Sequence, residues 1–277
     1  MNLFHDTSYG CSKLITKAYS TSFSLGIKTL DKKMHNPIYA IYGYVRYADE
    51  IVDTFHDFDK KKLLADYKQE TYKAIYEGVS LNPVLHAFQK TVNEYKIDYK
   101  LIDAFLKSME MDLEEKSYDD DLYDEYIYGS AEVVGLMCLK VFCEGNEEQY
   151  NNLKASARSL GAAFQKVNFL RDMKSDYYER GRVYFPGIKF TTFDNEIKKL
   201  IEDNIQKDFD DAYVGIMQLP KSSRKGVYLA YKYYLALFSK IKRANAEIVQ
   251  HERIRVSDTR KMGILFNTYI QSSLNLL

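Results

Sequence analysis

Apolar residues recur along the chain at spacings of three and four, the period of an amphipathic helix. The clearest stripe predicts a helix over residues 34–58 and consists of Ile41, Val45, Ala48, Val52 and Phe55. A second stripe, in the stretch 157–186 read as one helix that Pro186 stops, consists of Leu160, Ala163, Phe164 and Val167. No stretch alternates apolar and polar residues as a half-buried strand does. The pattern therefore predicts an all-α protein built as a helical bundle.

The remaining helices follow from the same spacing and from the glycine, proline and hydroxyl residues between them. A first helix over residues 7–29 is interrupted at Ser20, Thr21 and Ser22. Further helices are predicted at residues 60–78, from Asn82 onward, and at 99–115, 126–139, 192–217, 221–249 and 257 onward. The helix at 126–139 is almost wholly apolar, so we expect it to be central. We expect the apolar tail, residues 262–277, to pack against the core rather than lie on a bilayer surface.

Composition excludes several classes of protein. The chain of 277 residues has no stretch of linker composition, and we expect one domain over residues 1–277. Its 39 basic and 39 acidic residues cancel, so the overall charge does not favour a nucleic-acid partner. The 3 cysteines lack the spacing of a zinc site or a disulfide framework, which favours a reducing, cytoplasmic location. The sequence shows neither a secretory signal nor an apolar run of about 18 residues, so no membrane span is predicted.

A polar row runs beside the apolar face of the helix at 157–186 and consists of Gln165, Asn168, Asp172 and Asp176. Spacings of three, four and four place these side chains within an arc of about 80°. Taken alone, such a row is more often a solvated face. A second acidic pair, Asp49 and Asp53, flanks the stripe of the helix at 34–58. Each pair also has an arginine beside it, Arg46 or Arg171, and this repetition favours a functional site.

If the two helices face each other, four carboxylates converge at one end of a tyrosine-rich apolar cavity. Facing carboxylates repel one another unless a cation joins them, and Mg²⁺ prefers carboxylate and phosphate oxygens. A diphosphate bound to Mg²⁺ is a good leaving group, and we expect Arg46, Arg171 and Arg253 to hold it. Its departure leaves a carbocation, which survives only in a dry pocket lined by aromatic ring faces. The pattern therefore indicates an enzyme that acts on an isoprenyl diphosphate.

At these residues the chain resembles the squalene/phytoene synthase family of head-to-head isoprenoid synthases over nearly its whole length. The shared motifs are S-T-S-F from Ser20, Y-x-x-x-R-x-x-D-E-x-x-D from Tyr42, Y-x-x-G-x-A from Tyr126, Q-x-x-N-x-x-R-D-x-x-x-D from Gln165, G-R-x-Y-x-P from Gly181, and E-R-x-x-V around Arg253 with a lysine downstream. The long central motif is highly specific, whereas those at Tyr126 and Arg253 are loose. The resemblance implies the all-α isoprenoid synthase fold, with a central apolar cavity, and Mg²⁺-dependent condensation of two identical prenyl diphosphates through a cyclopropylcarbinyl diphosphate.

The resemblance also implies roles for individual residues. The metal ligands are Asp49, Asp53, Asn168, Asp172 and Asp176, which would hold two or three Mg²⁺ ions, or Mn²⁺ in their place. The diphosphate and substrate contacts are Arg46, Gln165, Arg171, Tyr234, Arg253 and Lys261, with Ser20, Thr21, Ser22 and Phe23 in a flap over one substrate. The aromatic residues near the reacting carbons are Tyr42, Tyr126 and Tyr184, and we assign Tyr126 to catalysis with the four aspartates. Departures from the family pattern at Ser108 and Glu132 bear on substrate fit rather than on the reaction.

We expect the substrate to be geranylgeranyl diphosphate, two molecules of which give phytoene through prephytoene diphosphate in carotenoid biosynthesis. The chain is similar to bacterial carotenoid enzymes, and the aliphatic Ile27, one turn beyond Phe23, favours a deep cavity. Two alternatives stay open, namely a squalene or dehydrosqualene synthase that uses two farnesyl diphosphates, and a family member that acts only as an assembly protein. The intact aspartates favour the enzyme.

Cofactor and location follow from the same comparison of motifs. No G-x-G-x-x-G motif is present, and a phytoene product needs no reductant, so no nicotinamide cofactor is expected. We expect a cytoplasmic protein that makes peripheral contact with the inner face of the membrane, where a hydrocarbon product is soluble. The sequence leaves the oligomeric state open.

Overall fold

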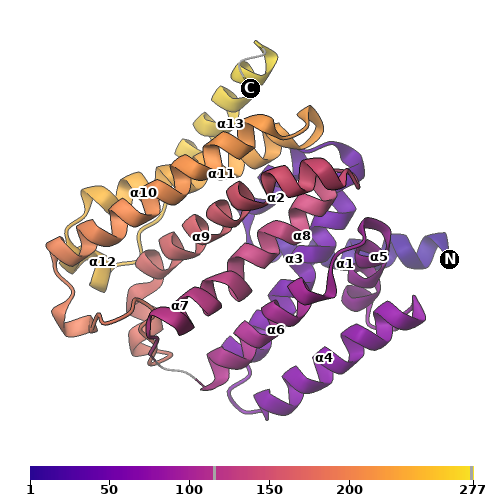
Figure 1. Cartoon of the computed structure of the whole chain (residues 1–277), viewed down its shortest axis with the longest axis horizontal. Coiled ribbons are helices and arrows are strands. Elements are labelled where there is room, and N and C mark those ends of the chain that lie inside the picture. The colour runs from indigo at the N-terminus through magenta and orange to yellow at the C-terminus, as the bar shows by residue number, and fades with distance from the viewer. Residues whose placement is uncertain (115–116, 275–276) are drawn as a thin grey trace.

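The computed structural model describes residues 1–114, 117–274 and 277, and these residues form a bundle of α-helices without a strand (Figure 1). The helices are α1 (Asn2–Tyr19), α2 (Thr21–Lys28), α3 (Lys32–Asp53), α4 (Lys60–Glu77), α5 (Pro83–Tyr95), α6 (Tyr99–Glu114), α7 (Asp120–Ile127), α8 (Val133–Phe142), α9 (Glu147–Tyr178), α10 (Asn195–Gln218), α11 (Lys221–Arg243), α12 (Ala246–His251) and α13 (Asp258–Ser273). A π-helical turn, η1 (Tyr128–Glu132), joins α7 to α8, and a 3-10 turn, η2 (Phe190–Thr192), precedes α10. The all-α prediction is confirmed.

Hydroxyl residues break the first predicted helix into two. Ser20 leaves the helical conformation, with φ −147° and ψ 102°, and its hydroxyl accepts a hydrogen bond from the backbone N–H of Phe23 at 3.2 Å. A serine in this position caps a new helix, because its oxygen satisfies one of the free N–H groups of the first turn. The interruption predicted at Ser20 is therefore confirmed, and it is a complete break, so that residues 7–29 form parts of two helices, α1 and α2.

Three predicted boundaries differ from the structure. α9 ends at Tyr178, before the predicted stop at Pro186. α3 ends at Asp53, so Phe55 lies beyond the helix and is 38% exposed rather than part of the buried stripe. The predicted helix at 221–249 breaks at Ala244, and the side chain of Asn245 then caps α12. Residue 115, the last of the predicted helix at 99–115, lies outside the described residues.

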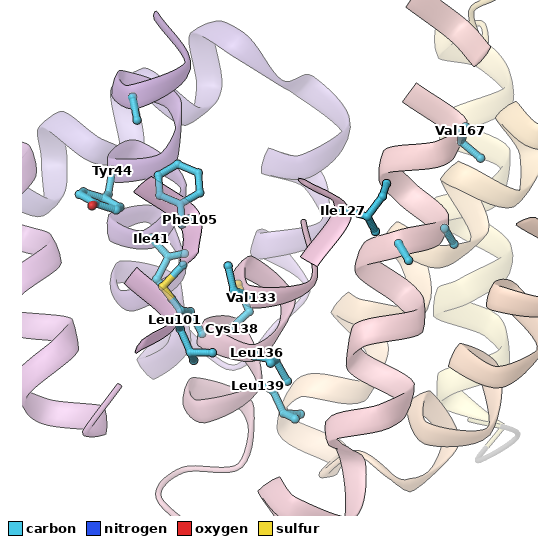
Figure 2. Close-up of a cluster of buried hydrophobic side chains, with 14 of the residues drawn as sticks. Ile41, Tyr44, Leu101, Phe105, Ile127, Val133, Leu136, Cys138, Leu139 and Val167 are labelled. Carbon is cyan, nitrogen blue, oxygen red and sulfur yellow. The ribbon is translucent and has the colours of Figure 1, made fainter. Parts of the chain in front are cut away.

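The core is built around α3, as the strength of its apolar stripe predicts. Tyr44 is fully buried, and its ring stacks on Phe88 of α5 at a centroid distance of 3.7 Å and lies 5.6 Å from the ring of Phe105 of α6. Figure 2 shows Tyr44 and Ile41 of α3 beside Phe105, with apolar side chains of α8 nearby. Burying aromatic rings of this size supplies a large part of the hydrophobic stabilisation of a domain. This packing fixes the helix that carries the first acidic pair.

Two glycines allow the centre of the bundle to pack closely. A Cβ at Gly129 in η1 would lie 2.4 Å from the backbone oxygen of Ala104 on α6, and a Cβ at Gly161 would lie 2.7 Å from the backbone oxygen of Ala131. Only glycine fits at such distances, so α6, η1 and α9 approach backbone to backbone. The predicted helix at 126–139 is indeed central, although a π-helical turn divides it. α9, which carries the second acidic pair, is held by this contact.

The C-terminal tail does not pack into the core as expected. α13 lies along α11, and of its residues only Thr268 is buried. Several large apolar side chains of α13 are exposed, among them Phe266 at 69%. The prediction of a buried tail is therefore wrong for the described part of α13, and residues 275 and 276 lie outside the described residues.

Candidate active site

One arginine joins the two acidic pairs across the bundle. The Nε of Arg180 lies 3.3 Å from Oδ1 of Asp53, at the end of α3, and its Nη1 lies 3.0 Å from Oδ1 of Asp176, on α9. Because a single guanidinium reaches both carboxylates, the two acids face each other over a short gap. Asp176 is buried, with 9% of its surface exposed. The structure therefore brings together one acid from each predicted pair.

A second arginine extends this cluster to α6. The buried Arg182 places Nη1 3.2 Å from Oδ1 of Asp53 and 3.2 Å from Oδ1 of Asp112, and its Nη2 donates to the backbone oxygen of Asp112 at 2.7 Å. The hydroxyls of Tyr126 and Tyr184 donate to the same carboxylate at 2.9 and 3.3 Å. Two of the three tyrosines predicted near the reacting carbons, Tyr126 and Tyr184, are thus fixed at the acidic end of the bundle.

Aromatic rings surround these phenols. Tyr184 stacks on Phe169 of α9 with centroids 4.1 Å apart, and Tyr126 lies 5.1 Å from Tyr184. A hollow with an internal volume of about 20 Å³ opens beside Phe169, Tyr184 and Asp176. Apolar walls of this kind keep water away from a reactive intermediate, and ring faces stabilise positive charge. The acids and the rings therefore share one region.

The other acid of each pair contacts further arginines. Asp172 lies 3.0 Å from the Nε of the neighbouring Arg171 and 2.9 Å from the Nε of Arg253. Asp49 lies 3.8 Å from Nη1 of Arg46, whose Nη2 is paired with Glu50. Every predicted catalytic aspartate therefore has at least one guanidinium partner, and the three arginines predicted to hold diphosphate lie beside aspartates.

Asp49 and Asp176, one acid from each predicted pair, have raised pKa values. Burial raises the pKa of Asp49 to about 7; Arg46 opposes this increase, while Asp53 and Asp112 add to it. Burial likewise raises the pKa of Asp176 to about 7, against the opposing effect of Arg180. In both groups burial, which disfavours the charged form of a carboxyl, is the largest cause of the raised pKa.

The third raised group is Asp112. Burial raises its pKa to about 6, Arg182 opposes the increase and Asp53 adds to it. Burial also raises the pKa of Tyr126 and of Tyr184 well above the ordinary value of a phenol, so both stay neutral donors near neutral pH. A neutral phenol can face a carbocation without attacking it as an oxyanion would.

The donor set fits a hard divalent cation, although the side chains are not gathered around one. Within the described residues, no group of three or more His, Cys, Asp or Glu side chains is arranged to hold a metal ion. The donors present are carboxylate oxygens from two facing helices, together with the amide oxygen of Asn168, and these are the ligands that Mg²⁺ prefers. At present Arg180 occupies the gap between Asp53 and Asp176. A bound cation would have to replace or move that guanidinium.

Other predicted contact residues lie on the same helices. Tyr234 of α11 stacks on Phe164 of α9 with centroids 3.8 Å apart, and its hydroxyl donates to Oδ1 of Asn168 at 3.3 Å. The side chain of Gln165 donates to the hydroxyl of Ser130 at 3.3 Å. Asn168 and Gln165 are thus held by partners from α11 and η1, which orients the polar row of α9.

The predicted flap residues lie at the start of α2. Ser20 caps α2, Thr21 is exposed and Ser22 is half-buried. Phe23 and Tyr42 lie together, with ring centroids 5.0 Å apart. Lys261, the last predicted contact, lies 3.1 Å from Asp258 on its own helix, so the structure pairs it with an acid outside the aspartate pairs.

Three residues of the cluster were not assigned a role from the sequence, namely Asp112, Arg180 and Arg182. A signal for Asp112 existed, because it continues the apolar stripe of Ile102, Phe105 and Met109, and an acid in such a line is a buried acid that needs partners. Arg182 belongs to the G-R-x-Y-x-P motif. For Arg180 no periodic signal exists, because it follows α9 in a loop.

An all-α bundle with two facing Asp-x-x-x-Asp pairs, ringed by arginines and tyrosines, defines the class of isoprenoid synthases that act on diphosphates. Sequence comparison gives the family. The model of the squalene/phytoene synthase family matches residues 16–260, and the chain therefore belongs to that family. It is a prenyltransferase of the head-to-head type.

The curated relatives include a diapophytoene synthase and phytoene synthases. The chain is 25% identical to the 4,4'-diapophytoene synthase of Staphylococcus haemolyticus, over 95% of this chain and 96% of the relative. It is 28% identical to the phytoene synthase of Arthrospira platensis, over 93% and 91%, and 28% identical to the chloroplastic phytoene synthase 1 of Solanum lycopersicum, over 92% and 66%. The family is common to all of them.

Solved structures show the same fold. A dehydrosqualene synthase in complex with a ligand superposes with a TM-score of 0.83 at 20% identity, covering 97% of this chain and 98% of the other. A squalene synthase from Alicyclobacillus acidocaldarius superposes with a TM-score of 0.75 at 19% identity, covering 86% and 94%. Among the described residues, no helix combines the length and the apolar character needed to cross a bilayer.

Proposed function

We propose that this protein joins two molecules of geranylgeranyl diphosphate head to head and forms phytoene through prephytoene diphosphate, with Mg²⁺ bound between the aspartate pairs. The observation that carries the proposal is the Arg180 bridge, which puts Asp53 and Asp176 on opposite sides of one narrow, positively bridged gap. Family membership supports the reaction type, and the phytoene synthases among the relatives support the C20 substrate.

Asp49, Asp53, Asn168, Asp172 and Asp176 would hold the metal, which when bound neutralises diphosphate oxygens. Arg171 and Arg253 lie against Asp172, and in the proposal they turn their remaining donors toward a departing diphosphate. The carbon–oxygen bond breaks as both electrons leave with the diphosphate, and the charge that develops there is already compensated. The allylic cation left behind lies in the region of Tyr126, Tyr184 and Phe169.

The aromatic residues of this region then act by excluding water and by offering ring faces. The phenols of Tyr126 and Tyr184 are held by Asp112, so their rings cannot rotate freely. Fixed rings stabilise a cation by about 0.5 to 2 kcal/mol each. Because water is excluded, the nucleophile that attacks the cation is the double bond of the second substrate.

A second candidate is the C15 reaction, in which two farnesyl diphosphates give dehydrosqualene by loss of a proton, or squalene when a hydride donor supplies two electrons. The match to the diapophytoene synthase over nearly the whole chain favours it. Ile27 was expected to leave room for a deep cavity. Its side chain is 2% exposed and packs in the core between α2 and the rest of the bundle. Residue size at this position therefore supports the C20 substrate only weakly.

Product identification distinguishes the two reactions. Purified protein is incubated with Mg²⁺ and either the C15 or the C20 diphosphate, with and without a hydride donor such as NADPH, and the extract is compared by chromatography with authentic C30 and C40 hydrocarbons. We expect a C40 product from the C20 substrate. Turnover of the C15 diphosphate alone would replace the proposal with the second candidate, and a lack of turnover with both would favour the assembly protein.

The metal assignment has its own test. We expect Asp49→Asn or Asp172→Asn to lower kcat by at least about 100-fold, because each removes a charge that holds the metal and its diphosphate. Helical content, measured by circular dichroism, should stay unchanged, since both side chains are part of the site rather than the core. Near-normal turnover in either variant contradicts the assignment.

A further inference from the structure

α13 presents an apolar face to solvent. Met262, Phe266, Tyr269 and Ile270 are 55%, 69%, 43% and 42% exposed. At about 100° per residue, these four side chains fall within an arc of about 100°. Thr268, the buried residue of α13, lies on the other side of the helix. The four residues, called here the α13 stripe, therefore lie on the exposed side of the helix, opposite Thr268.

The α13 stripe is also free of charge. The charged residues of α13 are Asp258, Arg260 and Lys261, all in its first turn, so that from Met262 to Ser273 no side chain is ionised. A solvent-facing helix in a soluble protein ordinarily carries charged residues on its outer side. An uncharged, apolar outer face instead marks a surface that meets another apolar phase.

The helix beneath α13 is strongly basic. α11 has no acidic residue and seven basic ones, namely Lys221, Arg224, Lys225, Lys232, Lys240, Lys242 and Arg243. The whole chain has equal numbers of acidic and basic residues. The positive charge of α11 is therefore a local excess. Among the described residues, none of the seven forms an ion pair.

One basic residue of α11, Lys225, contacts the α13 stripe, and three others share its side of the helix. Lys221, Lys225, Lys232 and Arg243 lie within an arc of about 40° on α11. The Nζ of Lys225 lies 4.4 Å from the centre of the Tyr269 ring, which joins the basic face to the stripe. Figure 1 shows α13 along α11 at the edge of the molecule. An apolar ridge with lysines beside it therefore occupies one accessible edge.

From this arrangement we infer that α11 and α13 form a docking surface for an anionic lipid bilayer. Helices that lie in the plane of a membrane combine an apolar face with flanking lysine and arginine, and anionic headgroups attract each such cation. Unpaired cations favour anionic lipid over a second copy of this chain, because in a symmetric dimer the two basic helices would approach each other. The inference goes beyond the proposed function and does not depend on it, since binding needs neither substrate nor metal.

Vesicle sedimentation tests the inference. Full-length protein is mixed with vesicles of phosphatidylcholine alone or of phosphatidylcholine with phosphatidylglycerol, and the bound fraction is measured at low and high salt. We expect binding to the anionic vesicles only, weakened by salt, because lysines supply part of the attraction. Phe266→Glu should weaken binding at least about 10-fold, because it places a charge on the inserted face.

Two matched variants complete the design. Tyr76→Glu introduces the same charge at an aromatic residue that is 93% exposed on α4, and it should bind like the unchanged protein. Lys225→Gln with Lys232→Gln should reduce the dependence on salt. The inference fails if Phe266→Glu binds normally, or if Tyr76→Glu loses binding equally. It also fails if light scattering shows a dimer that Phe266→Glu dissociates while vesicles remain unbound.

Discussion

Arg180 places a permanent positive charge between two carboxylates that come from different helices. Its guanidinium contacts Asp53 and Asp176, and it is 29% exposed, so water can also reach it. The pKa of Arg180 is raised, because the attraction of the two acids outweighs the opposing effect of burial. In the absence of metal this side chain does in part what a divalent cation would do, which is to reduce repulsion across the gap.

Arg180→Gln should therefore make the protein more dependent on metal. Without Mg²⁺ we expect a loss of about 1 kcal/mol of stability, the size typical of a partly exposed ion pair. With Mg²⁺ the loss should shrink, since the cation takes over the same gap, and half-saturation should need less Mg²⁺. Thermal unfolding over a series of Mg²⁺ concentrations measures both effects.

Arg243→Gln is the control for that experiment, because Arg243 is exposed on α11 and its Nε donates only to the backbone oxygen of Ser239. It should leave the response to Mg²⁺ unchanged. If Arg180→Gln needs more Mg²⁺ than the unchanged protein for half-saturation, Arg180 promotes the binding of Mg²⁺. The prediction that Arg180 competes with the metal would then be wrong.

The raised pKa values of Asp49 and Asp176, each about 7, predict how stability depends on pH. A carboxyl whose pKa is higher in the folded than in the unfolded protein binds its proton more tightly when folded. Metal-free protein should therefore gain stability as the pH falls from about 8 toward about 4, the ordinary pKa of an aspartate. Asp176, with 12% of its side chain exposed, should contribute more than Asp49, with 31%.

Thermal unfolding in EDTA at several pH values measures this effect. Asp176→Asn removes the titrating group, so its stability should rise less on acidification than that of the unchanged protein. Mg²⁺ should also flatten the profile, because metal and proton compete for the same oxygens. A stability that falls steadily from pH 8 to pH 6 in the metal-free protein would contradict the assigned pKa directions.

Among the elements, the helices could be predicted from sequence and the ends of several could not. Periodicity gives α3, α4 and α6 to within a few residues, because an apolar stripe needs no partner to be recognised. The sequence indicates an interruption at Ser20, but whether the chain kinks there or starts a new helix depends on one hydrogen bond, from the N–H of Phe23 to the Ser20 hydroxyl. Whether α13 is buried depends on whether the other helices already cover the apolar core. The local sequence of α13 does not contain that information.

The loop after α9 explains why the acidic pairs were found and the arginine bridge was not. Gly181 has φ +68°, in the left-handed region that favours glycine, and the chain there turns back so that the N–H of Arg182 donates to the backbone oxygen of Asp176 at 2.8 Å. This turn delivers Arg180 and Arg182 to the aspartates. Helical spacing predicts the directions of side chains only within a helix. It therefore gives no position for Arg180 and Arg182, which follow α9 in a turn.

The close packing at η1 gives a prediction for the helices themselves. Gly129→Ala should destabilise the protein by about 1 to 3 kcal/mol, since its Cβ would meet the backbone oxygen of Ala104 at 2.4 Å and Ser108 at 2.8 Å. Gly10→Ala on α1 is the matched control, because nothing lies within 4 Å of its Cβ. It should stabilise by up to about 1 kcal/mol through helix propensity.

Chemical denaturation with both glycine variants checks this pair of predictions. Equal stability changes in the two variants would show that α6 and η1 can move apart at little cost. Because η1 also carries Ser130, the partner of Gln165, we further expect Gly129→Ala to raise KM for the prenyl diphosphate more than Gly10→Ala does.

For the molecule as a whole, the proposed site is built from parts of the chain that are far apart in sequence. Asp49 and Asp53 lie on α3. Asp172 and Asp176 lie on α9, and Arg253 follows α12. A ligand that binds both sets must stabilise the folded state over the unfolded one. At a concentration about 100 times its Kd, one ligand adds about 2.7 kcal/mol, enough to raise Tm by several degrees.

We therefore expect inorganic diphosphate to raise Tm only when Mg²⁺ is present, since without the metal the anion meets carboxylates whose neighbouring arginines are already paired with them. Differential scanning calorimetry with diphosphate, Mg²⁺, both or neither measures the coupling. Asp172→Asn should abolish the joint effect, whereas Asp258→Asn, which removes the acid paired with Lys261 on α13, should retain it. An equal shift by diphosphate in EDTA would mean that arginines alone hold the anion, and the aspartates would then need another role.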